Sequence, residues 1–364
     1  MRVAFVHDWL VTYRGGEKVL AALLKLYPEA PIFTLFYDKE AMPAGITERI
    51  VVAPPVLNLV RPLRKLLLPL LPRAVESLKL DDFDLVISTS SCVAKGAIKG
   101  PSARHLCYIH SPMRYIWDQQ DEYIAGVAHI PGAAAAIRAL TPSLRQWDVS
   151  SASRVDRFVA NSSFVSERVR RLYAREAAVV HPPIATDRFR PFPGRGGYFL
   201  AAGALVSYKR FDLAIAACQQ AGKRLVIAGS GPMERTLRAQ AGPTVDFVIS
   251  PSDEVLGRLM GEAEALLFPG IEDFGMIAVE AMAAGTPVIA YGAGGARDFI
   301  VPGRTGVFFT EATATALAQR INEFSRDQFT AAALVEYAAG YGQEHFLKRM
   351  RAEIEALMVG GSDQ

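Results

Sequence analysis

Short apolar runs alternate with helical patterns along most of the chain. Residues 2–7 form a β-rich run, and a Gly pair and a helical pattern from about Glu17 to Leu26 follow it. Further strand-like runs lie at 31–37, 84–90, 103–110 and 156–162. This alternation is typical of a parallel sheet with helices on both faces.

The alternation starts again after residues 181–197, a stretch rich in Pro and Gly that we interpret as a linker. A helical pattern at 209–220 follows, and strand-like runs lie at 198–205, 223–231, 245–249, 263–269 and 286–292. We therefore expect an α/β protein of two Rossmann-like, doubly wound domains that face each other across a cleft. Ligands bind at the carboxyl ends of the strands in such domains.

Composition agrees with this organisation and excludes other classes. A chain of 364 residues suggests two domains, and 51% apolar with 21% charged residues excludes disorder. A net charge of only +3 argues against a dedicated nucleic-acid binder. The three cysteines are too few and too scattered for a disulfide framework. No apolar run approaches the ~20 residues of a membrane span, and the N-terminus has no signal-peptide pattern.

The segment 272–285 carries the clearest chemistry. Gly275 and Met276 stand at the first turn of a predicted helix, where free backbone N–H groups suit a diphosphate. Glu272 precedes this helix and Glu280 follows eight residues later, a rise of ~12 Å if the whole stretch is helical. A nucleotide sugar fits this layout. On spacing alone, a helix-capping Glu272 and a solvated Glu280 remain an alternative.

The sequence EDFGMIAVEAMAAGTPVIA resembles the signature of GT4-family retaining glycosyltransferases, which have the GT-B fold. The segments RGGEKV, SYKRFDLAIAA, IAGSGP, GGARDFI and GRTGVFF resemble other family segments, so the resemblance covers almost the whole chain. YIHSPMRYIWD at 108–118 is most similar to O-antigen mannosyltransferases of the WbaZ type. The resemblance implies an acceptor-binding domain of residues 1–186 plus about 341–364, and a donor-binding domain of residues 187–340.

The resemblance implies roles for several residues of the second domain. Glu280 matches the glutamate that holds the ribose, and Glu272 matches the one that binds the transferred sugar. Lys209 matches the lysine that neutralises the phosphates. The backbone amides that meet the sugar and the diphosphate match those of Phe274, Gly275 and Met276. Ala204 stands where the family usually has a phosphate-binding arginine.

In the first domain, the resemblance places Gly15 and Gly16 at the junction of diphosphate and acceptor. A plain tight turn is the alternative for this glycine pair. His110 matches a histidine near the donor sugar, where it would orient the sugar or stabilise charge. Without the resemblance, a structural histidine would be the simpler interpretation. The residues expected to shape the acceptor pocket are Arg114, Tyr115 and Trp117.

The implied reaction moves a hexose to a lipid-linked saccharide of a surface polysaccharide, with retention at the anomeric carbon. GDP-mannose is the first choice of donor and a UDP-sugar the second. No metal and no further cofactor are expected, because Lys209 and the backbone amides at the start of the helix can stabilise the charge of the diphosphate in place of a metal. Asp82 and Asp84 form a DxD, a pattern that binds a divalent metal in other glycosyltransferase folds. Here it lies at the start of a strand, away from the carboxyl end where ligands bind, so we do not expect it to hold a metal. An epimerase or a non-enzymatic sugar-binding protein remains an alternative.

Residues 56–80 combine five basic residues and one acidic residue with many leucines, so that this segment carries +4 and the rest of the chain −1. Such a segment suits the surface of an anionic bilayer, and its prolines divide it into short pieces. We therefore expect a cytoplasmic protein bound peripherally to the inner face of the membrane. Ordinary packing against the first domain is the alternative.

Overall fold

The protein is described here by a computed structural model, which covers residues 1–49, 51–61, 66–121, 124, 130 and 132–359. The chain divides into two compact units. The N-unit comprises Met1–His181 and Phe346–Gln364, and the C-unit comprises Pro182–His345. The chain thus leaves the N-unit once and returns to it near its end.

The N-unit is built on a seven-stranded parallel sheet with the order β3-β2-β1-β4-β5-β6-β7. The strands are β1 Val3–His7, β2 Ile32–Thr34, β3 Val51–Val52, β4 Leu85–Ser90, β5 Arg104–Ile109, β6 Arg157–Ala160 and β7 Ala177–Val179. The helices are α1 Gly15–Leu23, α2 Ala44–Thr47, α3 Pro55–Leu59, α4 Leu71–Glu76, α5 Arg114–Trp117, α7 Ala133–Ser151, α8 Ser163–Tyr173 and most of α16 Gln343–Val359.

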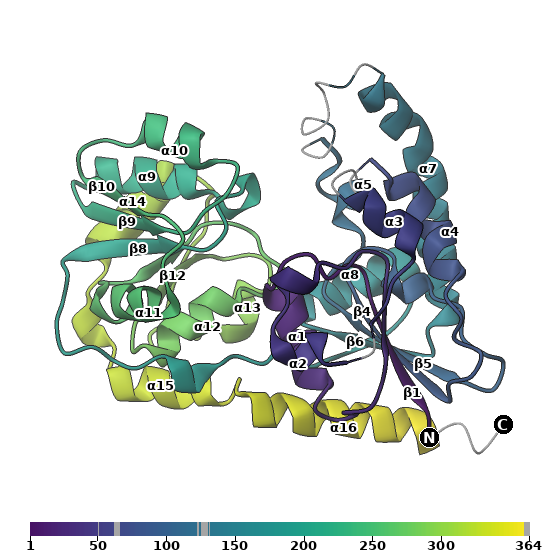
Figure 1. The fold of residues 1–364 in the computed structure, drawn as a ribbon. Helices are drawn as coiled ribbons and strands as arrows, with labels where there is room; N and C mark the ends of the chain where they lie inside the picture. Colours follow the sequence, from purple (N-terminus) through teal and green to yellow (C-terminus); the bar gives the residue numbers. More distant parts are fainter. Residues whose placement is uncertain (50, 62–65, 122–123, 125–129, 131, 360–364) are drawn as a thin grey trace. The chain divides into compact units, whose positions relative to one another are not determined.

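Helices cover both faces of this sheet. One face packs against α1, α2 and α16 (Figure 1), whose buried side chains include Leu20, Ile46 and Phe346. The other face packs against α4 and α7 through Val75 and Leu144, among others. The apolar runs of the central strands are continuous because the strands are buried on both sides.

The C-unit has a six-stranded parallel sheet with the order β10-β9-β8-β11-β12-β13. The strands are β8 Tyr198–Ala202, β9 Arg224–Ala228, β10 Val245–Val248, β11 Leu266–Phe268, β12 Val288–Tyr291 and β13 Gly306–Phe309. The helices are α9 Phe211–Gln220, α10 Glu234–Gln240, α11 Asp253–Glu262, α12 Met276–Ala283, α13 Ala296–Phe299, α14 Ala314–Glu323 and α15 Ala331–Ala339. Two such sheets confirm the expected doubly wound α/β class.

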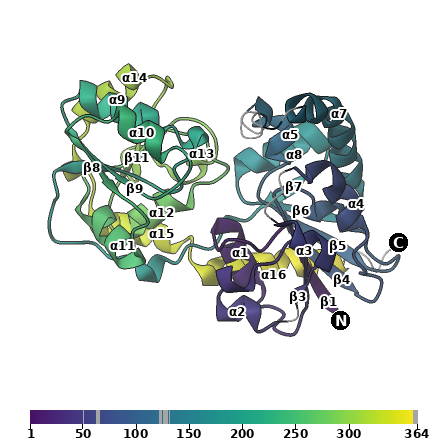
Figure 2. The same cartoon turned by 45° about the horizontal axis from the view of Figure 1, so that its top comes forward.

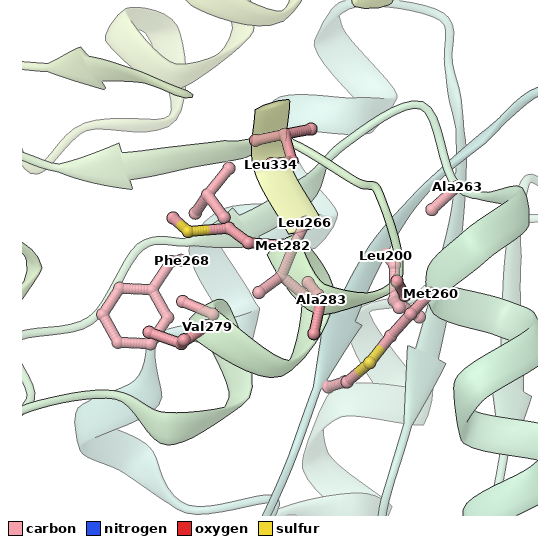
Figure 3. Close-up of a cluster of buried hydrophobic side chains, with 14 of the residues drawn as sticks. Leu200, Met260, Ala263, Leu266, Phe268, Val279, Met282, Ala283 and Leu334 are labelled. Atoms are coloured by element: carbon pink, nitrogen blue, oxygen red, sulfur yellow. The ribbon is translucent and has the colours of Figure 1, made fainter. Parts of the chain in front are cut away.

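The helix α12 is the central helix of the C-unit. It lies with α15 on one side of the sheet, whereas α9 and α14 lie on the other (Figure 2). Its Val279 and Met282 pack into the same cluster as Phe268 of β11 and Leu334 of α15 (Figure 3). Apolar side chains occur around the whole circumference of α12, as expected for a buried helix.

Several elements differ from the sequence-based expectation. The strands β3, β7 and β13 were not among the predicted runs, and the run at 31–37 contains a strand of only three residues. Residues 181–197 are not a free linker. Phe189 is buried in the C-unit core, and the backbone N–H of Gly196 donates to Glu262 O. The units separate at His181 and His345, compared with the expected boundaries at 186 and about 340.

The basic segment 56–80 forms short helical pieces, α3, the turn Leu68–Leu70 and α4. Residues 62–65, which include Arg64 and Lys65, lie outside the described residues. Within the described part, Leu68, Leu71 and Val75 are buried in the N-unit core, whereas Val56, Leu59 and Leu70 are exposed. No helix among the described residues is long and apolar enough to cross a membrane.

Candidate active site

The start of α12 is shaped by Gly275. Its φ of +107° is a left-handed conformation that favours glycine, and a Cβ there would lie 2.4 Å from Cζ of Phe268. Because the helix begins only at Met276, Glu280 lies about 6 Å along the axis from its start, and the residues from Glu272 to Gly275 are not helical. Glu280 is buried (6% exposed), which contradicts the solvated alternative.

An ion pair joins the loop before α12 to the loop after β8. The Nζ of Lys209 lies 2.5 Å from Oε1 of Glu272, and both side chains are largely buried. The expected helix 209–220 begins only at Phe211, because Arg210 adopts a left-handed φ of +55°. Lys209 therefore belongs to a 3₁₀ turn, Ser207–Lys209, that aims its ammonium group at Glu272.

Glycines bring the loops of this region into backbone contact. A Cβ on Gly270 would lie 2.3 Å from the carbonyl oxygen of Tyr208, so only glycine lets these two loops meet. A Cβ on Gly229 would lie 1.9 Å from the carbonyl oxygen of Gly203. The glycines of GSGP thus serve close packing between the loops after β8 and β9.

The loop between β12 and α13 contacts the backbone of Glu272. The backbone N–H of Gly295 donates to Glu272 O at 2.9 Å, and a Cβ on Gly294 would lie 2.7 Å from the same oxygen. Arg297 of the same loop region donates from its Nε to Gly292 O at 2.8 Å. The segment GGARDFI therefore fixes the backbone of Glu272, whose carboxylate pairs with Lys209.

In the N-unit, two histidines lie beneath the first turn of α1. His7 ends β1 and His110 follows β5, so both lie at the carboxyl edge of the sheet. A Cβ on Gly16 would lie 3.6 Å from Nε2 of His110 and 3.7 Å from Cε1 of His7. Gly15 and Gly16 are part of the helix, not of a loop, and Gly16 leaves the two rings uncovered by a side chain.

The histidines differ in their partners. Nδ1 of His7 lies 2.6 Å from the Thr89 hydroxyl, and its Nε2 lies 3.8 Å from Oε1 of Glu17. Nε2 of His110 is buried and has no hydrogen-bond partner within the described part of the chain. Burial lowers the pKa of His110 from 6.5 to about 3, and the nearby charge of His7 acts in the same direction. His110 is therefore a neutral imidazole.

Glu17 completes this group. Burial alone would raise its pKa, but the hydrogen bond and the charge of His7 outweigh burial and lower it. Its other oxygen accepts the backbone N–H of Arg14 at 2.9 Å and so caps α1. Sequence reasoning missed His7 and Glu17, although a polar residue at a strand end and the Glu of RGGEKV are the signals that point to them.

Asp8 was also missed, and it organises the loop after β4. Its two carboxylate oxygens accept the backbone N–H groups of residues 91–94 at 2.6–2.9 Å. Asp8 is 2% exposed, so this buried carboxylate is satisfied by backbone donors. It connects the carboxyl ends of β1 and β4, the edge that carries His7.

The three expected acceptor residues of α5 make different contacts. Nε of Arg114 donates to the hydroxyl of Ser111 at 3.3 Å, and its positive charge contributes to the lowered pKa of His110. Trp117 instead donates from Nε1 to Oδ2 of Asp148 at 2.7 Å, a contact that anchors α5 to α7. Tyr115 packs its ring near Trp9, with centroids 6.4 Å apart. Their roles toward an acceptor remain predictions.

The buried carboxylate of Asp148 pairs with the Nζ of Lys95 at 3.1 Å, deep in the N-unit. This pair and the three buried cysteines serve the core, and burial raises the pKa of Cys107 and Cys218 to about 12. Asp82 and Asp84 lie at the amino end of β4, where both contact Arg2. The described residues contain no group of three or more His, Cys, Asp or Glu side chains arranged to hold a metal.

Thus the C-unit brings together Lys209 and Glu272 at the approach to α12, which contains the buried Glu280. The N-unit brings together Gly16 and His110, with Arg114 near enough to act on the histidine electrostatically. Each group lies where ligands bind in α/β sheets, beyond the carboxyl ends of the strands.

Comparisons with known proteins identify the family of enzymes that the chain resembles. Residues 13–188 match the family model Glycosyltransferase Family 4, and residues 184–341 match Glycosyl transferases group 1. A D-inositol 3-phosphate glycosyltransferase of Streptomyces avermitilis is 30% identical over 223 residues, which are 52% of this chain and 48% of the relative. The chain spans about half the length of the curated relatives that it matches first.

Solved structures share the fold over the full length. Sucrose-phosphate synthase of Thermosynechococcus elongatus has a TM-score of 0.75 at 18% identity, covering 99% of this chain and 100% of that one. Anabaena HepE in complex with UDP has a TM-score of 0.72 at 16% identity, covering 98% and 100%. The comparisons do not single out O-antigen mannosyltransferases, so that narrower resemblance stays a prediction. The chain belongs to the GT4 family of glycosyltransferases with the GT-B fold.

Proposed function

We propose that the protein is a retaining hexosyltransferase that uses a nucleotide sugar. The observation that carries this proposal is the buried Lys209–Glu272 pair at the approach to α12, together with the buried Glu280 within that helix. A diphosphate attracts the ammonium of Lys209 and the N-terminal end of α12. Glu272 then receives the sugar hydroxyls, and Glu280 receives the ribose hydroxyls.

In the proposed reaction, the bond between the anomeric carbon and the phosphate oxygen breaks, and the acceptor oxygen bonds to the same face of the sugar. The proton of the acceptor hydroxyl passes to the leaving phosphate. Charge on that phosphate grows in the transition state, where Lys209 and the start of α12 stabilise it. His110 is neutral, its Nε2 has no hydrogen-bond partner among the described residues, and it orients the sugar.

There are two candidate donors. The resemblance of residues 108–118 favours GDP-mannose, whereas a structural relative, HepE, was solved with UDP-glucose. The acceptor that we propose is a lipid-linked saccharide of a surface polysaccharide. The curated relatives are named for a smaller acceptor, inositol 3-phosphate, which gives a second acceptor to test.

A donor screen tests the proposal. Thermal shift with GDP-, UDP- and dTDP-sugars should show one nucleotide stabilising the protein by about 2.7 kcal/mol at a hundred times its Kd. Glu280→Gln should weaken binding of the free nucleotide about 10- to 100-fold, because a hydrogen bond to a charged group is lost. Glu272→Gln should keep nucleotide binding and lose transfer. Glu311→Gln, at an exposed site, is the control.

Transfer itself is followed by NMR of the product, whose anomeric configuration should match that of the donor, with and without EDTA. Activity that EDTA abolishes and Mg²⁺ or Mn²⁺ restores would contradict the metal-free mechanism. Turnover of the donor without any acceptor would favour an epimerase. Unchanged transfer in both glutamate variants would overturn the assignment of the site.

We further propose that the described part of segment 56–80 contacts an anionic membrane surface. Val56 and Leu59 of α3 are 74% and 84% exposed, and Arg73 and Lys79 are exposed nearby in the sequence. Anionic vesicles should therefore float the protein more efficiently than zwitterionic ones. Val56→Ser with Leu59→Ser should reduce flotation, whereas Val255→Ser in the C-unit should not. Equal recovery with and without anionic lipid would count against docking.

A further inference from the structure

Two loops before the helices α12 and α13 pack against each other through their backbones. The first loop contains Glu272 and Phe274, and the second, residues 292–295, leads into α13. A Cβ on Gly295 would lie 2.4 Å from Asp273 O and 2.5 Å from Cα of Phe274, so no side chain fits between the loops. The backbone N–H of Gly295 also donates to Glu272 O. A displacement of one loop would therefore displace the other.

The side chain of Tyr341 connects the first loop to α13. Its ring lies 6.0 Å from the ring of Phe274, measured between centroids, and its hydroxyl donates to Asp298 O at 3.1 Å. Asp298 belongs to α13, a helix of four residues whose last carbonyl oxygens have no partner within the helix. One tyrosine thus contacts the residue before Gly275 and also the helix that follows the second loop.

Tyr341 is itself held in place by two other segments of the C-unit. Its carbonyl oxygen accepts the backbone N–H of Ile184 at 2.9 Å, and Ile184 is buried in the C-unit core. The hydroxyl of Tyr337 in α15 lies 3.2 Å from that of Tyr341. Because Tyr341 donates its one hydroxyl proton to Asp298 O, Tyr337 is the donor in this contact. Tyr341 can therefore support the two loops from a fixed position.

We propose that Tyr341 is a positioning residue for the donor diphosphate. It holds the backbone amides of Phe274–Met276 and the neighbouring Glu272 in the geometry that binds the donor. This role rests on the function proposed above, because these groups are the ones that would meet a nucleotide sugar. Tyr341 acts through the two loops, and a site held in its binding geometry loses less conformational freedom when the ligand binds.

Two tyrosine variants form a matched pair for the test. Tyr341→Phe removes the hydrogen bond to Asp298 and keeps the ring beside Phe274, whereas Tyr337→Phe removes the contact between the hydroxyls and leaves the bond to Asp298 in place. Calorimetry measures the affinity for GDP and UDP and for GMP and UMP. Tyr341→Phe should weaken binding of the preferred diphosphate about 3- to 10-fold. Its monophosphate, which lacks the second phosphate, should lose less than about 2-fold, since a bond remote from the ribose is changed. Tyr337→Phe should change neither affinity.

Hydrogen exchange tests the support of the loops without any ligand. Tyr341→Phe should speed exchange in residues 270–276 and 292–299, and Tyr337→Phe should not. Equal loss of both affinities, with faster exchange throughout the C-unit, would show a merely structural tyrosine and overturn the positioning role. Normal nucleotide binding and identical behaviour of the two variants would overturn it as well. Failure of the unaltered protein to bind either diphosphate would instead overturn the proposed function, and the donor role of Tyr341 with it.

Discussion

At the scale of single residues, the resemblance names candidate residues for the site but not the partners that hold them. Lys209 and Glu272 are expected to touch different parts of a ligand, and the structure shows that they pair with each other. Asp8 binds the backbone of residues 91–94, more than 80 positions away in the sequence. No local pattern reveals such a partner, because the fold alone brings the two segments together.

Gly16→Ala should impair transfer at the site without lowering the stability of the fold. Its Cβ would make an ordinary contact at 3.6 Å with Nε2 of His110, and alanine favours a helix over glycine by up to about 1 kcal/mol. We expect unchanged or higher stability and a loss of transfer of about 100-fold, because the methyl group covers the histidine.

The matched control is Gly45→Ala in α2, where a Cβ meets nothing within 4 Å. This variant should retain full activity. Equal activity in Gly16→Ala and in the control, measured by initial rates under saturating donor, would show that the space above His110 is not used. Thermal unfolding of both variants checks that neither loses its fold.

At the scale of elements, apolar runs predicted the central strands of both sheets but not their ends. The short edge strands β3 and β7 were missed because two or three residues give no periodicity. The start of α9 was also misplaced. Arg210 adopts a left-handed conformation that favours glycine, and nothing in the sequence KRFD indicates it. That one residue places Lys209 in a turn instead of a helix.

Gly275→Ala tests whether the start of α12 depends on its left-handed glycine. Strain at φ +107° and the 2.4 Å approach to Phe268 should together destabilise the C-unit by about 2–5 kcal/mol and weaken nucleotide binding. Gly303→Ala has a φ of +76° but meets nothing within 4 Å, so it should cost about 1–2 kcal/mol.

The difference between these two variants isolates the contact with Phe268 from the backbone strain. Hydrogen exchange of peptides around β11 and α12 gives the stability, and thermal shift gives the nucleotide affinity. Equal costs for both variants would mean that Phe268 moves aside freely and that the helix start tolerates a side chain.

At the scale of the whole molecule, the alternating pattern predicted two sheets, but the return of the chain came only from the resemblance. Composition and periodicity cannot show it, because α15 and α16 are both amphipathic segments near the end of the chain. The structure separates them by their cores. Leu334 of α15 is buried in the C-unit, whereas Phe346 of α16 is buried in the N-unit, packed against Tyr108.

Two large-to-small variants, twelve residues apart, should therefore destabilise different units. Phe346→Ala should cost about 3–5 kcal/mol and Leu334→Ala about 2–5 kcal/mol. All three tryptophans, Trp9, Trp117 and Trp147, lie in the N-unit, so tryptophan fluorescence reports the unfolding of that unit alone. Phe346→Ala should shift the fluorescence transition to lower denaturant concentration. Leu334→Ala should leave it in place and speed hydrogen exchange in residues 198–340. Equal shifts of the fluorescence transition would show that the chain unfolds as one cooperative body, despite its two separate cores.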